Sequence, residues 1–195
     1  MSGPLPPANL NLRTPRIVAI EADATLHRFY TSAYAPLFYD RSPSGRLNAP
    51  DGSYGVLYAA KRSRGAFAET FLRTPGRQML DPSLLARTAY VNLRVRRKIN
   101  LINFDGPGLA ILGATAEVVH GSLPYDIPQA WSAALHAHPG GMDGIAYTAR
   151  HDPHELCYAL FERAAAGVEE QRRIVELDAD WLWRLADAYE VGKAP

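Results

Sequence analysis

The sequence has very little cysteine and no long apolar run. Cys157 is the single cysteine among 195 residues, which excludes an internal disulfide framework and is typical of a reducing compartment. It stands inside the apolar run 156–161, so we expect a buried thiol in a strand. Residues 1–15 hold no apolar core of signal-peptide length, and no later run is long enough to cross a bilayer. We therefore expect a cytoplasmic protein without a membrane partner.

An excess of charge of either sign is also missing. The chain has 21 lysines and arginines against 20 aspartates and glutamates, which argues against a broad nucleic-acid or anionic-membrane surface. Any cationic chemistry must therefore be local. The apolar fraction of 47% is enough to fill the core of one domain of this length.

Metal-ligand spacing is absent as well. His136 and His138 precede a proline-glycine turn, and His151 and His154 surround another turn. No third ligand follows either pair at a recognisable spacing. The sequence therefore predicts no metal site.

The expected elements follow no strict strand-helix-strand rhythm, which predicts an α+β fold and not a doubly wound parallel sheet. Closely spaced prolines predict an extended N-terminal arm over 1–15, and a single domain follows over 16–195. Runs rich in β-branched and aromatic residues predict strands over 25–30, 55–60, 88–96, 98–103, 143–147 and 156–161. Helices are expected over 62–73, 108–119, 127–138 and 179–190.

Two arginines stand where their charge needs a partner. Strand alternation over 25–30 places Arg28 on the same face as Tyr30. A guanidinium is costly to bury alone, so we expect a carboxylate, an anionic ligand or solvent beside it. Arg46 precedes Asn48 in a turn-rich stretch, where backbone amides and a guanidinium can hold phosphate oxygens together. A solvated hairpin arginine is the simpler alternative.

An aromatic residue and an acidic residue follow these arginines. Tyr58 lies on a strand candidate, either as a half-buried sheet aromatic or as a ring that stacks on a flat cation. Phe67 and Phe71 form an apolar helical stripe, and Glu69 points about 200° away from Phe67 around that helix. Glu69 therefore either pairs with Arg73 in solvent or faces a cleft.

Together these segments resemble a known family. The stretch from Arg28 to Glu69, with GRLNAP, YGVLYAA and AFAETF, resembles the RES domain, and the resemblance continues through DGIAYTARHDP at 143–153. RES proteins are bacterial toxins that are usually encoded beside a helix-turn-helix antitoxin. The resemblance implies an ADP-ribosyltransferase-like mixed sheet core with flanking helices. It also implies an activity that consumes NAD.

The resemblance also implies a division of roles. In the family the bond between nicotinamide and ribose is broken, and the ADP-ribosyl group passes to inorganic phosphate or, in some members, to a protein. NAD is then a substrate and phosphate a co-substrate, with no resident cofactor; a homo-oligomer is left open. The matching positions imply catalytic roles for Glu69, Arg28 and Tyr58. They imply dinucleotide-binding roles for Arg46, Asn48, Tyr30 and Thr148.

One position departs from the family pattern. The serine that contributes to the family name normally lies two residues after the aromatic residue at Tyr147, where this chain has Ala149. Thr148 supplies a hydroxyl only if the turn is one residue shorter, and strand alternation points its side chain the other way. We favour retained NAD degradation, with two alternatives: a transferase that modifies a protein, and a non-catalytic NAD-binding module.

Overall fold

The computed structural model describes residues 3–74 and 76–194, and within them the chain forms ten strands, six α-helices and two 3-10 helices. The strands are β1 (Ile17–Ile20), β2 (Thr25–Thr31), β3 (Val56–Ala60), β4 (Met79–Leu80), β5 (Thr88–Val95), β6 (Ile99–Asn103), β7 (Gly144–Ala149), β8 (Asp152–Phe161), β9 (Val168–Ile174) and β10 (Gly192–Lys193). The helices are α1 (Ser63–Phe71), α2 (Pro82–Ala86), α3 (Pro107–Leu112), α4 (Ala116–His120), α5 (Asp126–His136), α6 (Asp180–Asp187), η1 (Leu10–Leu12) and η2 (Glu162–Gly167).

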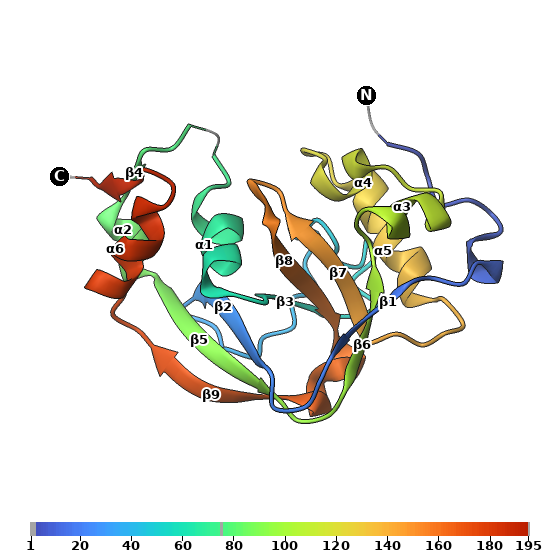
Figure 1. The fold of residues 1–195 in the computed structure, drawn as a ribbon, viewed down its shortest axis with the longest axis horizontal. Coiled ribbons are helices and arrows are strands. Elements are labelled where there is room, and N and C mark those ends of the chain that lie inside the picture. The colour runs from blue at the N-terminus through green and yellow to red at the C-terminus, as the bar shows by residue number, and fades with distance from the viewer. Residues whose placement is uncertain (1–2, 75, 195) are drawn as a thin grey trace.

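Eight of these strands form one mixed sheet in the order β1-β6-β7-β8-β3-β2-β5-β9. β6 and β7 run parallel, and the other neighbours run antiparallel. β5 and β6 are joined by residues 96–98 alone, although they lie near opposite edges of the sheet. The sheet therefore curls strongly, as Figure 1 shows. Fully buried side chains of β5 and β6, such as Leu93 and Leu101, accordingly share one core cluster.

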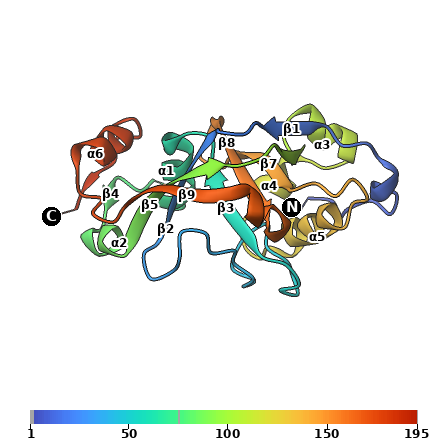
Figure 2. The same cartoon turned by 90° about the horizontal axis from the view of Figure 1, so that it is seen from below.

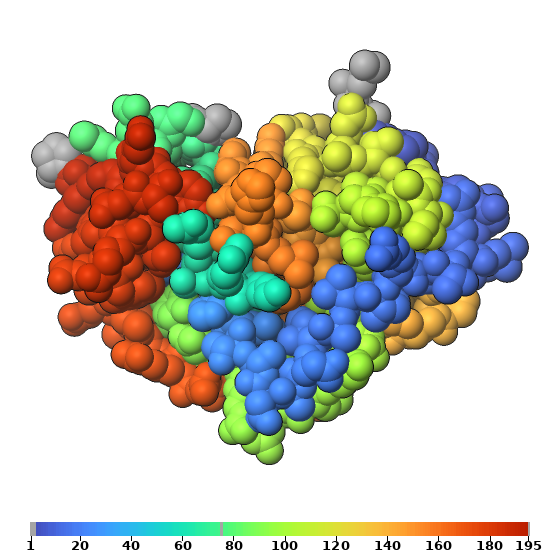
Figure 3. Space-filling model, viewed as in Figure 1, coloured from blue at the N-terminus to red at the C-terminus, as the bar shows by residue number. Residues whose placement is uncertain are grey.

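The helices pack against the other face of the sheet in two groups. α2 and α6 lie at one end of the molecule with α1 beside them toward the middle, and α3, α4 and α5 lie at the other end (Figures 1 and 2). The tip of the β7–β8 hairpin stands between the two groups in the space-filling view (Figure 3). Phe71 of α1 packs edge-on against Phe29 of β2, with ring centroids 5.1 Å apart. Trp131 of α5 packs on Phe104 with centroids 5.5 Å apart. This arrangement places α1 above the middle of the sheet.

The N-terminal segment packs along the second helix group. Trp131 donates its indole N–H to the Pro4 carbonyl oxygen at 2.7 Å, and His138 Nε2 lies 3.0 Å from the Arg13 carbonyl oxygen. Leu10, within η1, is only 4% exposed. Residues 3–15 are therefore anchored to the domain by hydrogen bonds and by an apolar side chain.

The α+β class is confirmed, whereas several predicted boundaries are wrong. The helix predicted over 108–119 is two helices, because Gly113 adopts φ +77° and closes α3 with a left-handed C-cap. β9 was not predicted, since its sequence VEEQRRI is polar and it lies at the edge of the sheet. β1, the other edge strand, has only four residues.

The carboxylate of Asp143, directly before β7, leads to a prediction about stability. Asp143 accepts hydrogen bonds from both terminal nitrogens of Arg97, at 3.0 and 2.6 Å, and from the Asn100 N–H at 3.0 Å. Burial alone would raise the pKa of Asp143, but these donors outweigh burial and lower it. The stabilisation is therefore fully present above the ordinary carboxyl pKa of about 4, and it is lost as the pH falls through the lower folded-state value.

We predict that Asp143→Asn lowers the free energy of unfolding by about 1–3 kcal/mol at pH 7, because charged hydrogen bonds are lost. The difference from the wild type should shrink in acid, where both proteins carry a neutral group. Urea unfolding at pH 7 and pH 3 measures it, with Asp187→Asn, an exposed position on α6, as the control. An equal difference at both pH values would contradict the prediction.

Candidate active site

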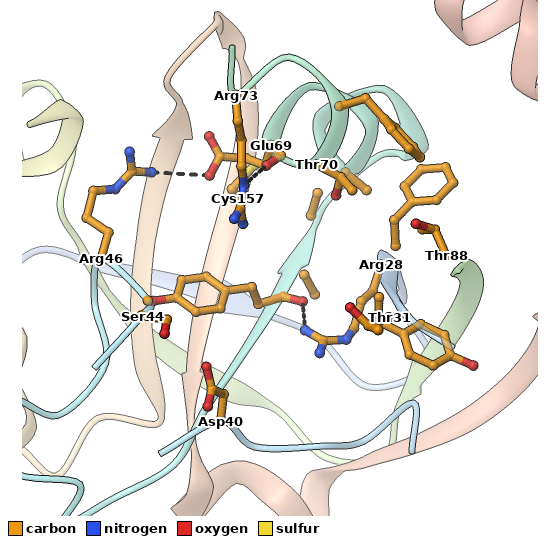
Figure 4. A pocket seen from close by; sticks show the side chains of 18 of the residues that line it. Arg28, Thr31, Asp40, Ser44, Arg46, Glu69, Thr70, Arg73, Thr88 and Cys157 are labelled. Atoms are coloured by element: carbon orange, nitrogen blue, oxygen red, sulfur yellow. Dashed lines mark hydrogen bonds and ion pairs between the residues drawn. The ribbon is translucent and has the colours of Figure 1, made fainter. Parts of the chain in front are cut away.

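The four residues on which the sequence analysis depends meet in one cleft. This cleft has a volume of about 1010 Å³ and lies between α1, the loop before β3 and residues of β2 and β3. Arg28, Arg46, Tyr58 and Glu69 all line it, and so does Tyr30. Figure 4 shows the Arg46–Glu69 pair in one part of the cleft and Arg28 in another. Segments far apart in the chain therefore contribute to one site.

Arg28 occupies a gap between two strands. β2 and β3 are paired only at His27 and Ala60 and then diverge. The Arg28 guanidinium fills this gap and donates to the Tyr58 carbonyl oxygen at 2.7 Å. Its Nε is buried without a hydrogen-bond partner, and no carboxylate within the described residues forms an ion pair with it. Burial lowers the pKa of Arg28 to about 10, so the group remains charged at neutral pH. Such a cation is suited to an anionic ligand.

Three donors fix the carboxylate of Glu69. One oxygen accepts from Arg46 at 3.2 Å and lies 3.3 Å from the Tyr147 hydroxyl, and the other accepts from the Arg150 N–H at 2.9 Å. Arg73 donates instead to the Glu69 carbonyl oxygen at 2.9 Å. The alternative of a solvated pair between Glu69 and Arg73 is therefore wrong. Glu69 faces the cleft in a fixed orientation.

Asn48 has a different place from the one predicted. It is fully buried, with Oδ1 accepting from the Tyr58 hydroxyl at 2.9 Å and Nδ2 donating to Asp40 at 3.0 Å and to the Ser42 carbonyl oxygen at 2.7 Å. The Tyr58 hydroxyl in turn accepts from the Leu47 N–H at 2.8 Å. All polar atoms of the Asn48 side chain are thus engaged by the fold, and Asn48 is not among the described residues that line the cleft. Its observed contacts position the loop.

Helix α5 holds the same loop from outside. Gln129 donates to the Pro43 and Gly45 carbonyl oxygens at 2.8 and 3.0 Å, and Ser132 donates to the Leu47 carbonyl oxygen at 2.6 Å. A Cβ at Gly45 would collide with Asn48 Oδ1, so this close approach requires glycine. The sequence analysis missed these anchors because no spacing relates α5 to a loop more than 80 residues away.

The electrostatics of the site follow from burial and from Glu69. Burial alone would lower the pKa of Arg46, but Glu69 and nearby phenols outweigh it and raise the pKa. Burial raises the pKa of Tyr58 and of Tyr147 as well. Both phenols are therefore neutral near pH 7, and Tyr147 can donate its proton in a hydrogen bond to the carboxylate.

The cleft carries an excess of cationic groups. Two carboxylates line it, those of Asp40 and Glu69. Seven arginines also line it: Arg28, Arg41, Arg46, Arg73, Arg77, Arg87 and Arg150. In the part of the chain that the structure describes, only two of the seven form ion pairs, Arg41 with Glu162 and Arg46 with Glu69. The remaining guanidinium groups suit a ligand with several negative charges.

The structure does not bring Thr148 to the cleft. Alternation along β7 turns its side chain away, toward Asp105 at 3.4 Å, so its predicted binding role is corrected. Ala149, at the position of the expected serine, is 1% exposed and belongs to the core beneath α1. Hydroxyl groups reach the cleft from other elements, at Ser44 and Thr70. No spacing in the sequence indicates these two positions.

The sequence analysis also named one cysteine and four histidines, of which Cys157 and His151 line the cleft. Cys157 is buried in β8 at 1% exposure, which confirms the expected buried thiol. His136 stacks on the Tyr54 ring with centroids 3.8 Å apart. Within residues 3–74 and 76–194, no group of three histidine, cysteine or acidic side chains could hold a metal ion. The same residues contain no helix with the length and apolar character that a bilayer-spanning segment needs.

The Tyr58 hydroxyl gives a second prediction. Tyr58→Phe keeps the ring but leaves Asn48 Oδ1 and the Leu47 N–H without their partner. We expect a loss of about 1–3 kcal/mol in the free energy of unfolding, because two buried polar groups become unsatisfied. We also expect faster amide hydrogen exchange over residues 42–48. Tyr34→Phe, which changes an exposed tyrosine, is the control. Unchanged exchange in this loop would refute the role given to Tyr58.

Comparison with known proteins agrees with the resemblance found in the sequence. The RES domain model matches residues 20–182, most of the chain. Among solved structures, a chain of "Crystal structure of the M.tuberculosis MbcT-MbcA toxin-antitoxin complex" is similar, with a TM-score of 0.62 and 15% sequence identity. The alignment covers 87% of this chain and 92% of that chain, which shows that the two share a fold. No curated protein matches. The family match, together with the fold and the clustered residues, establishes that this chain belongs to the RES domain family.

Proposed function

We propose that this protein degrades NAD by cleaving the bond between nicotinamide and ribose, with inorganic phosphate as acceptor. The observation that carries the proposal is the Glu69 carboxylate, held by three donors inside a cleft with an excess of arginine. Membership of the RES domain family supports it. NAD is the substrate in this scheme and not a resident cofactor.

The chemistry suits a fixed carboxylate. Nicotinamide leaves as a neutral molecule and takes the electron pair of the C–N bond, so positive charge develops on the ribose as in glycoside cleavage. A carboxylate held beside the sugar stabilises that charge, and it needs no reorganisation during the reaction. The Arg150 N–H and Arg46 keep Glu69 in one orientation. A phosphate oxygen then forms the new bond at the anomeric carbon.

The cleft arginines have different roles in binding the anionic parts of the substrates. Arg28 has no carboxylate partner among the described residues and presents a buried cation to the cleft, so it suits the pyrophosphate of NAD. Arg46 is already paired with Glu69 and lies 5.7 Å from the centre of the Tyr147 ring. The other cleft arginines favour a second anion, which supports phosphate as acceptor over water.

Glu69→Gln tests the proposal. The substitution preserves shape but removes the charge, so we expect kcat/KM for NAD to fall at least about 100-fold. Released nicotinamide, measured by chromatography, is the readout. Glu117→Gln, at an exposed position on α4, makes the same chemical change outside the cleft and should leave the rate unaltered. A variant that cleaves NAD as fast as the wild type would exclude Glu69 from the reaction.

The acceptor is tested with the wild-type protein. Phosphate should raise the rate of nicotinamide release and yield a phosphorylated ADP-ribose. Labelling of one discrete protein when the enzyme and labelled NAD are added to lysate would instead indicate a protein transferase. Bound but intact NAD, with no nicotinamide after hours, would indicate a binding module and overturn the enzymatic proposal.

We also propose that the protein is the toxin of a toxin-antitoxin pair whose antitoxin contains a helix-turn-helix. The similar solved structure is that of a toxin-antitoxin complex, which supports this proposal. Induced expression should stop bacterial growth and lower cellular NAD, whereas expression of Glu69→Gln at the same level should do neither. Growth arrest by Glu69→Gln without loss of NAD would contradict the proposal.

A further inference from the structure

Two stacked aromatic rings stand on the rim of the cleft. Tyr34 and Phe38 are 55% and 38% exposed, and their ring centroids lie 4.7 Å apart with the planes 11° from parallel. Of the exposed large hydrophobic side chains within the described residues, these two alone line the cleft. Exposed rings cost free energy in water, so a pair at the mouth of a site indicates a ligand.

The ring pair lines the same cleft as Arg28. Tyr34 lies in the turn that follows β2, where its N–H donates to the Thr31 carbonyl oxygen at 3.0 Å. The same loop ends at Tyr39 and Asp40. Burial lowers the pKa of Arg28, whereas the charges of these two groups raise it. The loop therefore starts directly after the strand of Arg28, and its last residues line the same cleft as the guanidinium.

The loop of the two rings and the charged groups belong to one cavity. In Figure 4 the Arg46–Glu69 pair lies apart from Arg28 within the cleft. The loop that carries Tyr34 and Phe38 begins directly after β2, the strand of Arg28, and ends at Asp40, which accepts a hydrogen bond from Asn48. Its rings therefore line the same cavity as Arg28 and Glu69. A dinucleotide cleaved at Glu69 and held at Arg28 has these two rings within its cleft.

We propose that Tyr34 and Phe38 form the platform for the adenine ring of the substrate, an inference that rests on the proposed function. The more exposed Tyr34 offers a flat face on which a purine can continue the stack. Arg28 holds the adjoining phosphate through charge-assisted hydrogen bonds. A purine nucleotide is the ligand class that combines a flat apolar ring with a neighbouring phosphate, as this part of the cleft does.

Titration calorimetry with AMP tests this subsite without any cleavage. We expect Tyr34→Ser to weaken AMP binding about tenfold, as loss of a stacked base does. The double variant with Phe38→Ser should weaken it further. Leu12→Ser is the control, because Leu12 is 81% exposed and lies outside the described residues that line the cleft. An AMP affinity equal to that of the wild type in both variants overturns the proposal.

A second measurement distinguishes adenine from nicotinamide on this platform. The ratio of kcat/KM for NAD to that for nicotinamide mononucleotide should fall about tenfold in Tyr34→Ser, because only NAD carries adenine. An unchanged ratio together with weaker nicotinamide mononucleotide binding would place the pyridine ring here and overturn the assignment. If the wild type cleaves neither compound, the proposed function fails, and AMP affinity still decides the subsite.

Discussion

The hydrogen bond from the Tyr58 hydroxyl to the buried amide of Asn48 is the contact on which the candidate site depends. Tyr58 lies in the central strand β3, and Asn48 lies in a long segment that has little regular structure. Their bond, with the one from the Leu47 N–H, ties this segment to the sheet. Arg46 is thereby carried into contact with Glu69 on α1. The rigid strand β3 thus fixes the Tyr58 phenol, and the phenol fixes the loop. The loop in turn places the charge of Arg46 beside Glu69.

Much of the fold could be predicted from side-chain patterns because those patterns record burial. The strand predicted over 88–96 is β5, whose Ala89, Val91, Leu93 and Val95 alternate into the core. β9 could not be predicted from its own pattern, because most of its side chains face water and its pairing with β5 stabilises it. The curl of the sheet could not be predicted either. It follows from a topology in which consecutive strands β5 and β6 are separated by most of the sheet.

The candidate site could be predicted in its charged and aromatic members but not in its supports. Arg28, Arg46 and Glu69 are residue types whose burial needs a reason, so the sequence draws attention to them. The backbone N–H of Arg150 has no sequence signature, although it lies 2.9 Å from Glu69 across 81 residues. Asn48 shows the reverse problem. An amide in a loop can bind a ligand or hold the loop together, and only the packing decides between the two.

The divergence of β2 from β3 has a mechanical consequence. The two strands share one registered pair, His27 and Ala60, so the ladder between the two halves of the sheet is interrupted at its centre. The Arg28 side chain bridges this interruption through one bond to β3. An anion seated on Arg28 and in contact with both strands therefore acts as an additional rung. Under the proposed function, ligand binding would therefore join the two halves of the sheet at a point where their own ladder has a single registered pair.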